Sequence, residues 1–407
     1  MTHMPLTKED RLLAGKLAEF YKDHLYHNIL PFWECRTVDR ENGGYLHCFD
    51  RKGNLYDNEK YIWFQGRQLW MFSRLFRETG DQKWLDLAKI GRDFLMEGSC
   101  AYAGNGRFNY QLDPTGKEVR YGTNSHHTDF FVMQALGEYA LASGDHTDVP
   151  LLQEMWPIWI HNILDPKCED VFHSVYDPRF LTYPMGAPYL ATVLYKLLGQ
   201  QAIDDAKKCA QIILYTYAKD DYKALFENLT PEGNVLLEDT GTICNPGHTA
   251  EAMWFIMDFA RLAKESTLFD RAVEVLDWDW EKGVDHERGG FYSFMNVTGG
   301  EPYQAAWHKE TGARWDDKVW WANAEPLVSL AMAANALNSH QWFQRFLQHH
   351  EFTQKYFADH IYGEWFSSLN WDNSVKDDAK GSLWKAAYHL PRALLYTYKE
   401  LSAIANG

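Results

Sequence analysis

The chain has 407 residues, of which 46% are hydrophobic and 15% aromatic, so it holds enough apolar material for a large core. Its formal net charge of −16 argues against nucleic acid or an anionic membrane as a partner. The polar N-terminal segment has no apolar signal core, and no apolar run reaches the length of a membrane span. We therefore expect a soluble, cytoplasmic protein.

The 6 cysteines lie far apart in sequence, with no C-x-x-C pair. This spacing predicts neither a zinc site nor a disulfide framework, and it fits a reducing compartment. No low-complexity segment or linker interrupts the chain, so we expect a single domain over residues 1–407. The 17 tryptophans are unusually many; such an excess often lines sugar-binding clefts, although most of them will be core.

An internal repeat organises the sequence. Each repeat has a short aromatic stretch, a turn rich in Asp, Asn, Pro or Gly, a polar run and then an apolar helix. The aromatic stretches begin near Gly43, Phe108, Val171, Phe226, Gly289 and Gly363, with a turn at Asp177-Pro178 in the third repeat. The apolar helices begin near Gln68, Asp129, Tyr183, Asn245, Lys318 and Tyr388.

Amphipathic helical patterns lie between successive repeats, with charged residues on one side. They cover residues 8–26, 82–96, 151–163, 203–218, 268–276 and 341–357. When apolar helices alternate with amphipathic ones, two concentric rings bury the apolar surface best, with the apolar helices in the inner ring. We predict an all-α fold, a closed (α/α)6 barrel or toroid with short β-hairpins over one end. A right-handed solenoid of helix pairs is the alternative that periodicity does not exclude.

In the toroid the inner-helix N-termini meet at one mouth, where unsatisfied N–H groups suit polar ligands. The residues at these six helix starts are chemically selective. They are Arg67 with Trp63 and Gln65; His126, His127 and Asp129; Tyr183; His248 and Glu251; Trp321 and Glu325; and Lys385, His389 and Arg392. Several such groups at equivalent points of separate repeats indicate a catalytic or binding cavity.

The fourth helix start is the most informative. Asn245 suits the N-cap and Pro246 the first helical position, and His248 and Glu251 then share one face of the first turn. Such a titratable pair indicates proton chemistry. The alternative is that His248 only supports a capped core helix. The neighbouring pair His349-His350 is expected to be solvent-exposed on an amphipathic helix.

Standard nucleotide, serine-hydrolase and zinc-protease motifs are absent from the sequence. A metal site of His248, Glu251 and His389 is an alternative because H-x-x-E occurs in metal centres of helical bundles, but we expect no metal. Two histidines facing each other across a Trp-lined cavity suit reversible proton abstraction from carbon, since imidazole acts as acid or base near pH 7. One base on each face of a sugar enediolate inverts C2, and protonation at C1 gives a ketose instead. Arg67 would then stabilise the oxyanion and Glu325 would orient a histidine or bind a hydroxyl.

The chain resembles the N-acylglucosamine 2-epimerase family, also described as renin-binding proteins, over nearly its whole length. The resemblance rests on five ordered motifs: Tyr61-Ile-Trp-Phe-Gln-Gly-Arg-Gln-Leu-Trp70, Asn245-Pro-Gly-His-Thr-Ala-Glu-Ala-Met-Trp-Phe255, Lys318-Val-Trp-Trp-x-x-x-Glu325, Tyr362-Gly-Glu-Trp-Phe366 and Lys380-Gly-x-x-x-Lys385-x-x-x-His389-x-Pro-Arg392. It implies an (α/α)6 barrel that interconverts N-acetylglucosamine and N-acetylmannosamine without a redox cofactor.

The resemblance also implies roles for single residues. The counterparts of Arg67, His248, Glu325 and His389 are essential in the family, with the two histidines as the acid/base pair. The other residues at the helix starts are expected to bind substrate. The family further suggests ATP as an effector that is not consumed, and a homodimer. One departure concerns substrate identity: residues 122–131 read GTNSHHTDFF, where the family more often has a Ser-Glu-Cys-Phe-like run.

Three alternatives remain at this stage. An aldose–ketose isomerase of mannose/fructose type would use the same enediolate. A glycoside hydrolase on the same toroid would need two cavity carboxylates, which Asp129 with Glu325 or Glu251 could supply. A non-catalytic sugar-binding or protein-binding role would be marked by an exposed apolar patch.

Overall fold

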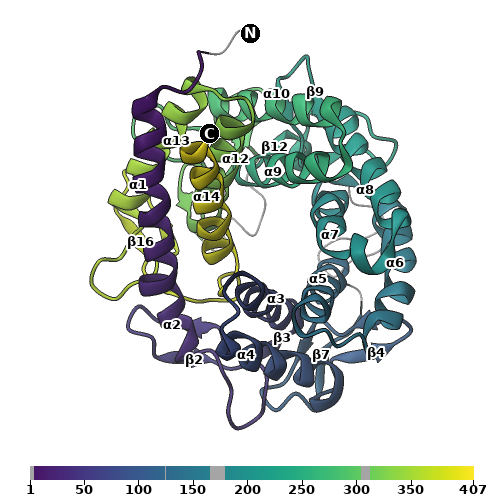
Figure 1. Ribbon diagram of the computed structural model, residues 1–407. Coiled ribbons are helices and arrows are strands. Elements are labelled where there is room, and N and C mark those ends of the chain that lie inside the picture. Colours follow the sequence, from purple (N-terminus) through teal and green to yellow (C-terminus); the bar gives the residue numbers. More distant parts are fainter. Residues whose placement is uncertain (1–3, 124, 166–178, 304–311) are drawn as a thin grey trace. The chain divides into compact units, whose positions relative to one another are not determined.

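The computed structural model describes residues 4–123, 125–165, 179–303 and 312–407 (Figure 1). The third aromatic stretch with its turn, and Cys168, lie outside the described residues. The chain divides into two compact units, which are taken separately below. The first unit comprises residues 1–32, 213–380 and 389–407, and the second comprises residues 33–212 and 381–388.

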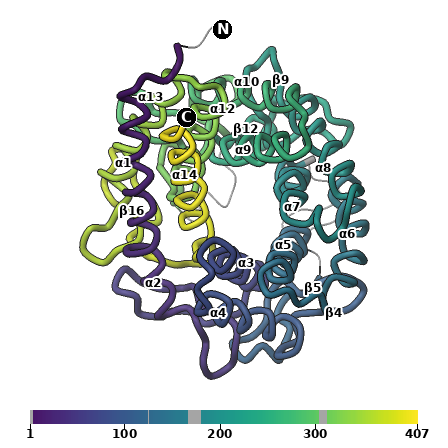
Figure 2. The backbone as a smooth tube through the Cα atoms, in the orientation of Figure 1, coloured from purple at the N-terminus to yellow at the C-terminus, as the bar shows by residue number. Residues whose placement is uncertain are grey.

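In the first unit, three inner helices pack side by side and each is backed by an outer helix (Figures 1 and 2). α12 packs between α9 and α14, while α10, α13 and α1 pack on α9, α12 and α14 respectively. The bounds are α9 (Pro246–Ala263), α12 (Trp320–Ala336), α14 (His389–Asn406), α10 (Ser266–Gly283), α13 (His340–Tyr356) and α1 (Lys8–His24).

Short elements connect these helices in the first unit. The strands pair antiparallel, β9 with β10, β12 with β13, and β15 between β14 and β16. The elements are η1 (Leu25–Ile29), α2 (Leu30–Glu34, which ends in the second unit), η3 (Ile213–Tyr217), β9 (Ala218–Lys219), β10 (Ala224–Leu225), β11 (Asn228–Leu229), η4 (Asp239–Thr242), β12 (Ile243–Cys244), β13 (Met295–Asn296), β14 (Lys318–Val319), β15 (Ser368–Leu369) and β16 (Val375–Asp377).

The second unit repeats the arrangement. α5 packs against α3 and α7, and the outer helices α4, α6 and α8 pack on α3, α5 and α7. Antiparallel strands pair β1 with β2, β4 with β5, and β6 with both β3 and β7. The bounds are β1 (Cys48–Phe49), β2 (Leu55–Asp57), β3 (Lys60–Tyr61), α3 (Ile62–Thr79), α4 (Gln82–Asp93), η2 (Phe94–Gly98), β4 (Tyr102–Gly104), β5 (Arg107–Phe108), β6 (Gln111–Leu112), β7 (Val119–Tyr121), α5 (His126–Ser143), α6 (Val149–Leu164), β8 (Arg179–Phe180), α7 (Thr182–Leu198) and α8 (Gln200–Ile212).

The inner helices are those that the sequence predicts from their apolar circumference. α5 and α12 bury residues on every face, whereas α4 and α8 bury only one side. The helix starts also follow the sequence: the Asn245 side chain caps α9 by accepting from the His248 N–H at 3.1 Å, with Pro246 at the first position. The predicted alternation of apolar and amphipathic helices is thus confirmed within each unit.

A buried lysine–aspartate pair recurs at the aromatic stretches. In the first unit Lys318 lies 2.9 Å from Asp285, and Lys380 lies 2.9 Å from Asp359. In the second unit Lys60 lies 2.6 Å from Asp39. Each aspartate also accepts N–H groups of its own loop, and each lysine directly precedes or leads toward an inner helix. The pair therefore fastens each of these aromatic loops to the next inner helix.

The sequence predicts that His349 and His350 are solvent-exposed, and for His349 this prediction is wrong. His349 is only 3% exposed, and its Nε2 lies 2.7 Å from the Asn323 carbonyl oxygen of α12. It points inward because position 349 falls on the face of α13 that packs on α12. His350 is half-buried, with its Nδ1 2.8 Å from the Tyr21 hydroxyl of α1. In the part of the chain that the structure describes, no helix is long and apolar enough to cross a membrane.

Candidate active site

His248 lies in the first turn of α9 and is held through one ring nitrogen. Its Nδ1 lies 3.0 and 3.1 Å from the two carboxylate oxygens of Glu227, which belongs to the loop between β10 and β11. Burial alone lowers the pKa of His248, but the charge and hydrogen bond of Glu227, with the charge of Glu251, raise it by more. The pKa of His248 therefore lies above its ordinary value.

His389, at the start of α14, is held in the same way by a different carboxylate. Its Nδ1 lies 2.7 Å from Oε1 of Glu325, on α12. The same Oε1 accepts from Arg392 at 2.6 Å, and Oε2 accepts from the Trp254 indole N–H at 2.8 Å. Arg392 also donates to Glu251. One guanidinium thus neutralises two buried carboxylates next to His389. Glu251 and Arg392, which the sequence predicts to bind substrate, are therefore placed to support His389.

Trp321 brings the two histidines together in the first unit. Its ring centroid lies 4.9 Å from that of His248 and 5.6 Å from that of His389. Both imidazoles are anchored through Nδ1, so Nε2 is the nitrogen that points away from the anchoring carboxylate in each ring. Two imidazoles that both contact one indole can act on the same small molecule.

Glu251, Glu325 and His389 are also the described residues whose ligand atoms lie close enough to hold a metal ion, all within 4.8 Å of one another. The cluster differs from the predicted alternative, since His248 is replaced by Glu325. The Arg392 guanidinium donates to both carboxylates of the cluster. A divalent cation would have to displace this positive charge, so the donor set suits an internal ion pair better than a metal.

In the second unit, Arg67 lies in a cage of aromatic rings. Its guanidinium carbon lies 4.8 Å from the Trp63 ring centroid, 4.2 Å from that of Phe131 and 5.2 Å from that of Tyr388. Trp63 and Arg67 come from the first turns of α3, Phe131 from α5 and Tyr388 from the loop before α14. Cation–π contacts of this kind hold a guanidinium in place without consuming all its N–H donors.

Gln65 has a structural position rather than the predicted contact with substrate. It is fully buried, and its amide accepts from the Tyr45 N–H at 2.7 Å and donates to the Tyr45 carbonyl at 2.8 Å. Asn323 clamps Phe291 in the same way in the first unit, with bonds of 2.8 and 3.3 Å. The amide at this repeat position fastens the aromatic stretch to the inner helix.

Asp129 likewise makes contacts with neighbouring groups of the protein. Its carboxylate lies 2.5 Å from Arg107 and accepts from the Phe108 N–H at 3.1 Å, so it fastens β5 to α5. The rings of His126 and His127 lie 5.6 and 6.2 Å from that of Tyr183, which starts α7.

Lys385 is buried in the loop of residues 381–388, where its backbone N–H donates to Ser382. The second unit thus brings His126 and Tyr183 into contact with each other.

The sequence reasoning missed Glu227, Phe131 and Tyr388. Glu227 lies within the aromatic stretch of the fourth repeat, Phe226-Glu-Asn228, which we interpreted only as a marker of the repeat. A carboxylate directly after an aromatic residue of the repeat was the available signal. Its pairing with His248 depends on the contact of its loop with β12, where the Glu227 N–H donates to the Ile243 carbonyl, and no local sequence pattern reveals this contact.

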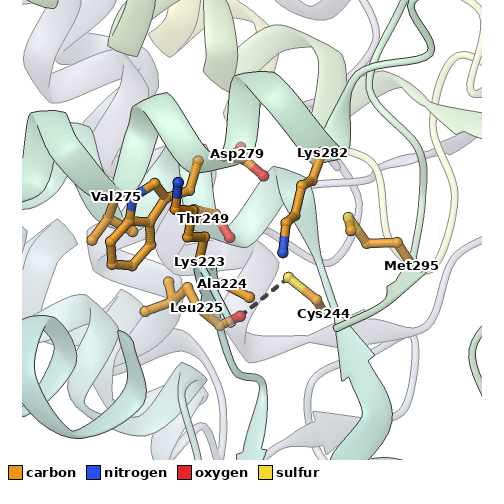
Figure 3. A pocket seen from close by; sticks show the side chains of 10 residues that line it. Lys223, Ala224, Leu225, Cys244, Thr249, Val275, Asp279, Lys282 and Met295 are labelled. Carbon is orange, nitrogen blue, oxygen red and sulfur yellow. Dashed lines mark hydrogen bonds between the residues drawn. The ribbon is translucent and has the colours of Figure 1, made fainter. Parts of the chain in front are cut away.

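A separate cavity of about 10 Å³ lies on the other side of the α9 start (Figure 3). Thr249, Cys244, Asp279 and Lys282 contribute to its lining. This volume holds roughly one water molecule, so the cavity is not a sugar site. Cys244 donates to the Leu225 carbonyl at 3.1 Å, and burial raises the pKa of its thiol well above the ordinary value.

Comparisons with known proteins point to one family. The sequence profile of the family described as N-acylglucosamine 2-epimerase matches residues 44–393. The chain is 29% identical to N-acylglucosamine 2-epimerase from Rattus norvegicus over 93% of this chain and 90% of that protein.

Two solved structures are similar over almost the full length. Cellobiose 2-epimerase from Spirochaeta thermophila has a TM-score of 0.81 at 20% identity, covering 97% of this chain and 98% of that one. D-mannose isomerase has a TM-score of 0.79 at 19% identity, covering 94% and 97%. The cellobiose 2-epimerases are (α/α)6 toroids, so the predicted fold is confirmed and the solenoid is excluded.

Proposed function

Because the chain belongs to the N-acylglucosamine 2-epimerase family and is a carbohydrate epimerase of the isomerase class, we propose that it interconverts N-acetylglucosamine and N-acetylmannosamine. The observation that carries this proposal is the pair His248 and His389. Each is anchored through Nδ1 to a carboxylate, and both lie against Trp321.

The reaction begins with the open-chain sugar, because C2–H is acidic only when C1 is a carbonyl. One histidine takes the C2 proton through Nε2, the C2–H electron pair forms the C1=C2 double bond, and the carbonyl π pair moves to the C1 oxygen to give the enolate. The other histidine returns a proton to the opposite face of C2, which inverts that carbon. Substrate and product have the same oxidation state, so the proposed step needs no redox cofactor.

The remaining residues are given supporting roles in this proposal. Stabilisation of the developing oxyanion by Arg67 stays a prediction from the sequence, and within the second unit its aromatic cage keeps the guanidinium oriented. Glu325 orients His389, and Trp321 offers an apolar surface to the sugar ring. Trp63, His126, Tyr183 and Lys385 stay predictions as substrate contacts. An ATP effector, a homodimer and a cytoplasmic location also stay predictions.

An aldose–ketose isomerase is the second candidate, because protonation of the same intermediate at C1 gives a ketose. The similarity to the structure of D-mannose isomerase supports this second candidate. A glycoside hydrolase fits less well. The carboxylates considered for it are held in ion pairs, Asp129 with Arg107 and Glu325 with Arg392. A general acid must carry a proton, whereas each of these two carboxylates faces an arginine.

The test is NMR of N-acetylmannosamine and of mannose, each incubated with the protein in D2O. The proposal expects N-acetylglucosamine from the first sugar, with deuterium at C2 of the product. A ketose from either sugar moves the assignment to an isomerase. If neither sugar exchanges its C2 proton, the proton-transfer mechanism is wrong.

A further inference from the structure

Glu227 holds His248 but has no part in the reaction described above. Its backbone N–H donates to the Ile243 carbonyl of β12 at 3.4 Å. β12 leads directly through the Asn245 cap into the first turn of α9. Glu227 and His248 are therefore positioned by the same short segment, and the Glu227 carboxylate is only 11% exposed. This arrangement fixes the carboxylate against the imidazole.

The contact determines which tautomer His248 adopts. Both Glu227 oxygens lie 3.0–3.1 Å from Nδ1, and a carboxylate can only accept a hydrogen bond. Nδ1 must then carry the hydrogen, and Nε2 of the neutral ring carries the lone pair. The other tautomer would direct the Nδ1 lone pair at the carboxylate and leave Nε2 unable to accept a proton.

The charges around His248 differ from those around His389. On α9 itself Glu251 is bonded to Arg392; α12 contributes the neutral Trp321, and Asp279 and Lys282 of α10 line the cavity on the Thr249 side. Within the described ranges, no cation other than His248 lies within ion-pair distance of Glu227. Glu325, by contrast, shares its charge between His389, Arg392 and Trp254. The charge of Glu227 therefore acts mainly on His248.

We propose that Glu227 is a positioning residue of the epimerase, which fixes the His248 tautomer that exchanges the C2 proton through Nε2 and stabilises the ring as imidazolium. This inference rests on the function proposed above. As an acid, His248 gives its Nε2 proton to C2 and keeps the Nδ1 hydrogen on Glu227. As a base, Nε2 takes the C2 proton, and the resulting imidazolium is held by the carboxylate.

The Glu227→Gln variant tests the charge, because glutamine keeps the shape and can still accept from Nδ1. Without the negative charge, the pKa of His248 falls. Activity needs one protonated and one neutral histidine, and deprotonation of His248 forms the alkaline limb of kcat/KM against pH. We expect this limb to move to lower pH in E227Q. It should move equally in both directions, because neutral epimers have a pH-independent equilibrium constant.

The Glu227→Leu variant removes the hydrogen bond as well, and kcat should fall on the order of 10²-fold, within the range of general acid–base catalysis. Nitrogen-15 NMR of the histidine rings should show the Nδ1–H tautomer of His248 in the unaltered protein and in E227Q, and a mixture of tautomers in E227L. The matched control is Glu232→Gln, which removes the same charge from an exposed position on the next turn. Its pH profile should coincide with that of the unaltered protein.

The outcomes separate this inference from the function it rests on. If the unaltered protein does not exchange C2–H of any tested sugar, the proposed function fails. If it epimerises and the alkaline limb of E227Q coincides with that of E232Q, the role of Glu227 is contradicted. If E227L fails to fold, E227Q and its nitrogen-15 shifts still decide.

Discussion

At the scale of single residues, the site consists of histidines whose second nitrogen is fixed by a carboxylate. His389 shows how far the support extends, because Glu325 is itself held by Arg392 and by the Trp254 indole. The sequence predicted both histidines and Glu325 from their positions at helix starts. Glu227 was missed because its partner lies 21 positions away along the chain, and the two meet through the contact of the Glu227 loop with β12.

The hydrogen bond from Trp254 to Glu325 should affect catalysis rather than binding. Trp254→Phe keeps the buried ring and removes the N–H, so Glu325 holds His389 less firmly. Because a hydrogen bond to a charged group contributes about 1.5–3 kcal/mol, we expect kcat to fall roughly 10- to 100-fold with KM little changed. Steady-state kinetics measure this. Trp342→Phe, also buried but on α13, serves as the control and should leave kcat near its original value. An unchanged kcat in W254F would contradict the support role.

Asp279 should make stability depend on pH. Burial raises its pKa well above 3.8, and its Oδ2 has no hydrogen-bond partner among the described residues. The folded protein keeps this proton while the unfolded chain releases it, so stability present below about pH 3.8 is lost as pH rises toward the folded-state pKa. Asp279→Asn should therefore raise Tm at pH 7, with the difference vanishing near pH 4. Thermal unfolding of D279N and of the exposed control Asp270→Asn measures this. An equal difference at both pH values would contradict the assignment.

At the scale of elements, the recurring loop-to-helix fastening explains why short aromatic stretches predict the architecture. The aromatic residue packs inward, an amide of the inner helix clamps its backbone, and a buried lysine–aspartate pair closes the loop. The sequence revealed the repeat through these aromatics. It misassigned Gln65 to substrate, because a polar residue at a helix start looks the same whether it faces a cavity or a neighbouring backbone.

The Lys318–Asp285 pair should be costly to break on one side. Lys318→Met leaves Asp285 buried and uncompensated, which typically costs about 3–5 kcal/mol. The double variant Lys318→Met with Asp285→Asn should recover part of this loss, since no charge remains buried. Urea denaturation gives the free energies of unfolding, with exposed Lys16→Met as the control. If the single variant is no less stable than K16M, the pair does not fasten the loop.

At the scale of the whole molecule, buried histidines should make the fold sensitive to acid. Burial lowers the pKa of His24, His47, His349 and His350 to about 4, from 6.5. The unfolded chain binds these protons first, so stability falls as pH drops from about 6.5 toward 4.

His349→Gln removes one of these groups and keeps a donor for the Asn323 carbonyl. The loss of Tm between pH 7 and pH 5 should become smaller by about 2–4 °C, the shift that roughly 1 kcal/mol gives in a large domain. His286→Gln, at an exposed position, should leave that loss unchanged. A pH dependence in H349Q equal to that of the unaltered protein would contradict this account.

The architecture was predictable because it is repetitive: inner helices such as α5 and α12 are apolar all round, outer helices such as α4 and α8 are apolar on one side, and both patterns are visible in the sequence. The partners of the functional residues were not, because they depend on side-chain contacts between repeats. Arg67 illustrates this limit. Its position in a motif predicted a functional residue, but Phe131 and Tyr388, which complete its cage, come from other parts of the second unit.

The central claim is that His248 and His389 each serve one face of C2. The most direct measurement is C2 deuterium exchange in D2O from each pure epimer, with His248→Asn and His389→Asn. The account predicts that neither variant interconverts the epimers, and that each still exchanges the C2 proton of one epimer only, a different one for each variant. Near-normal epimerisation in either variant, or exchange of both epimers by the same variant, would contradict the two-histidine mechanism.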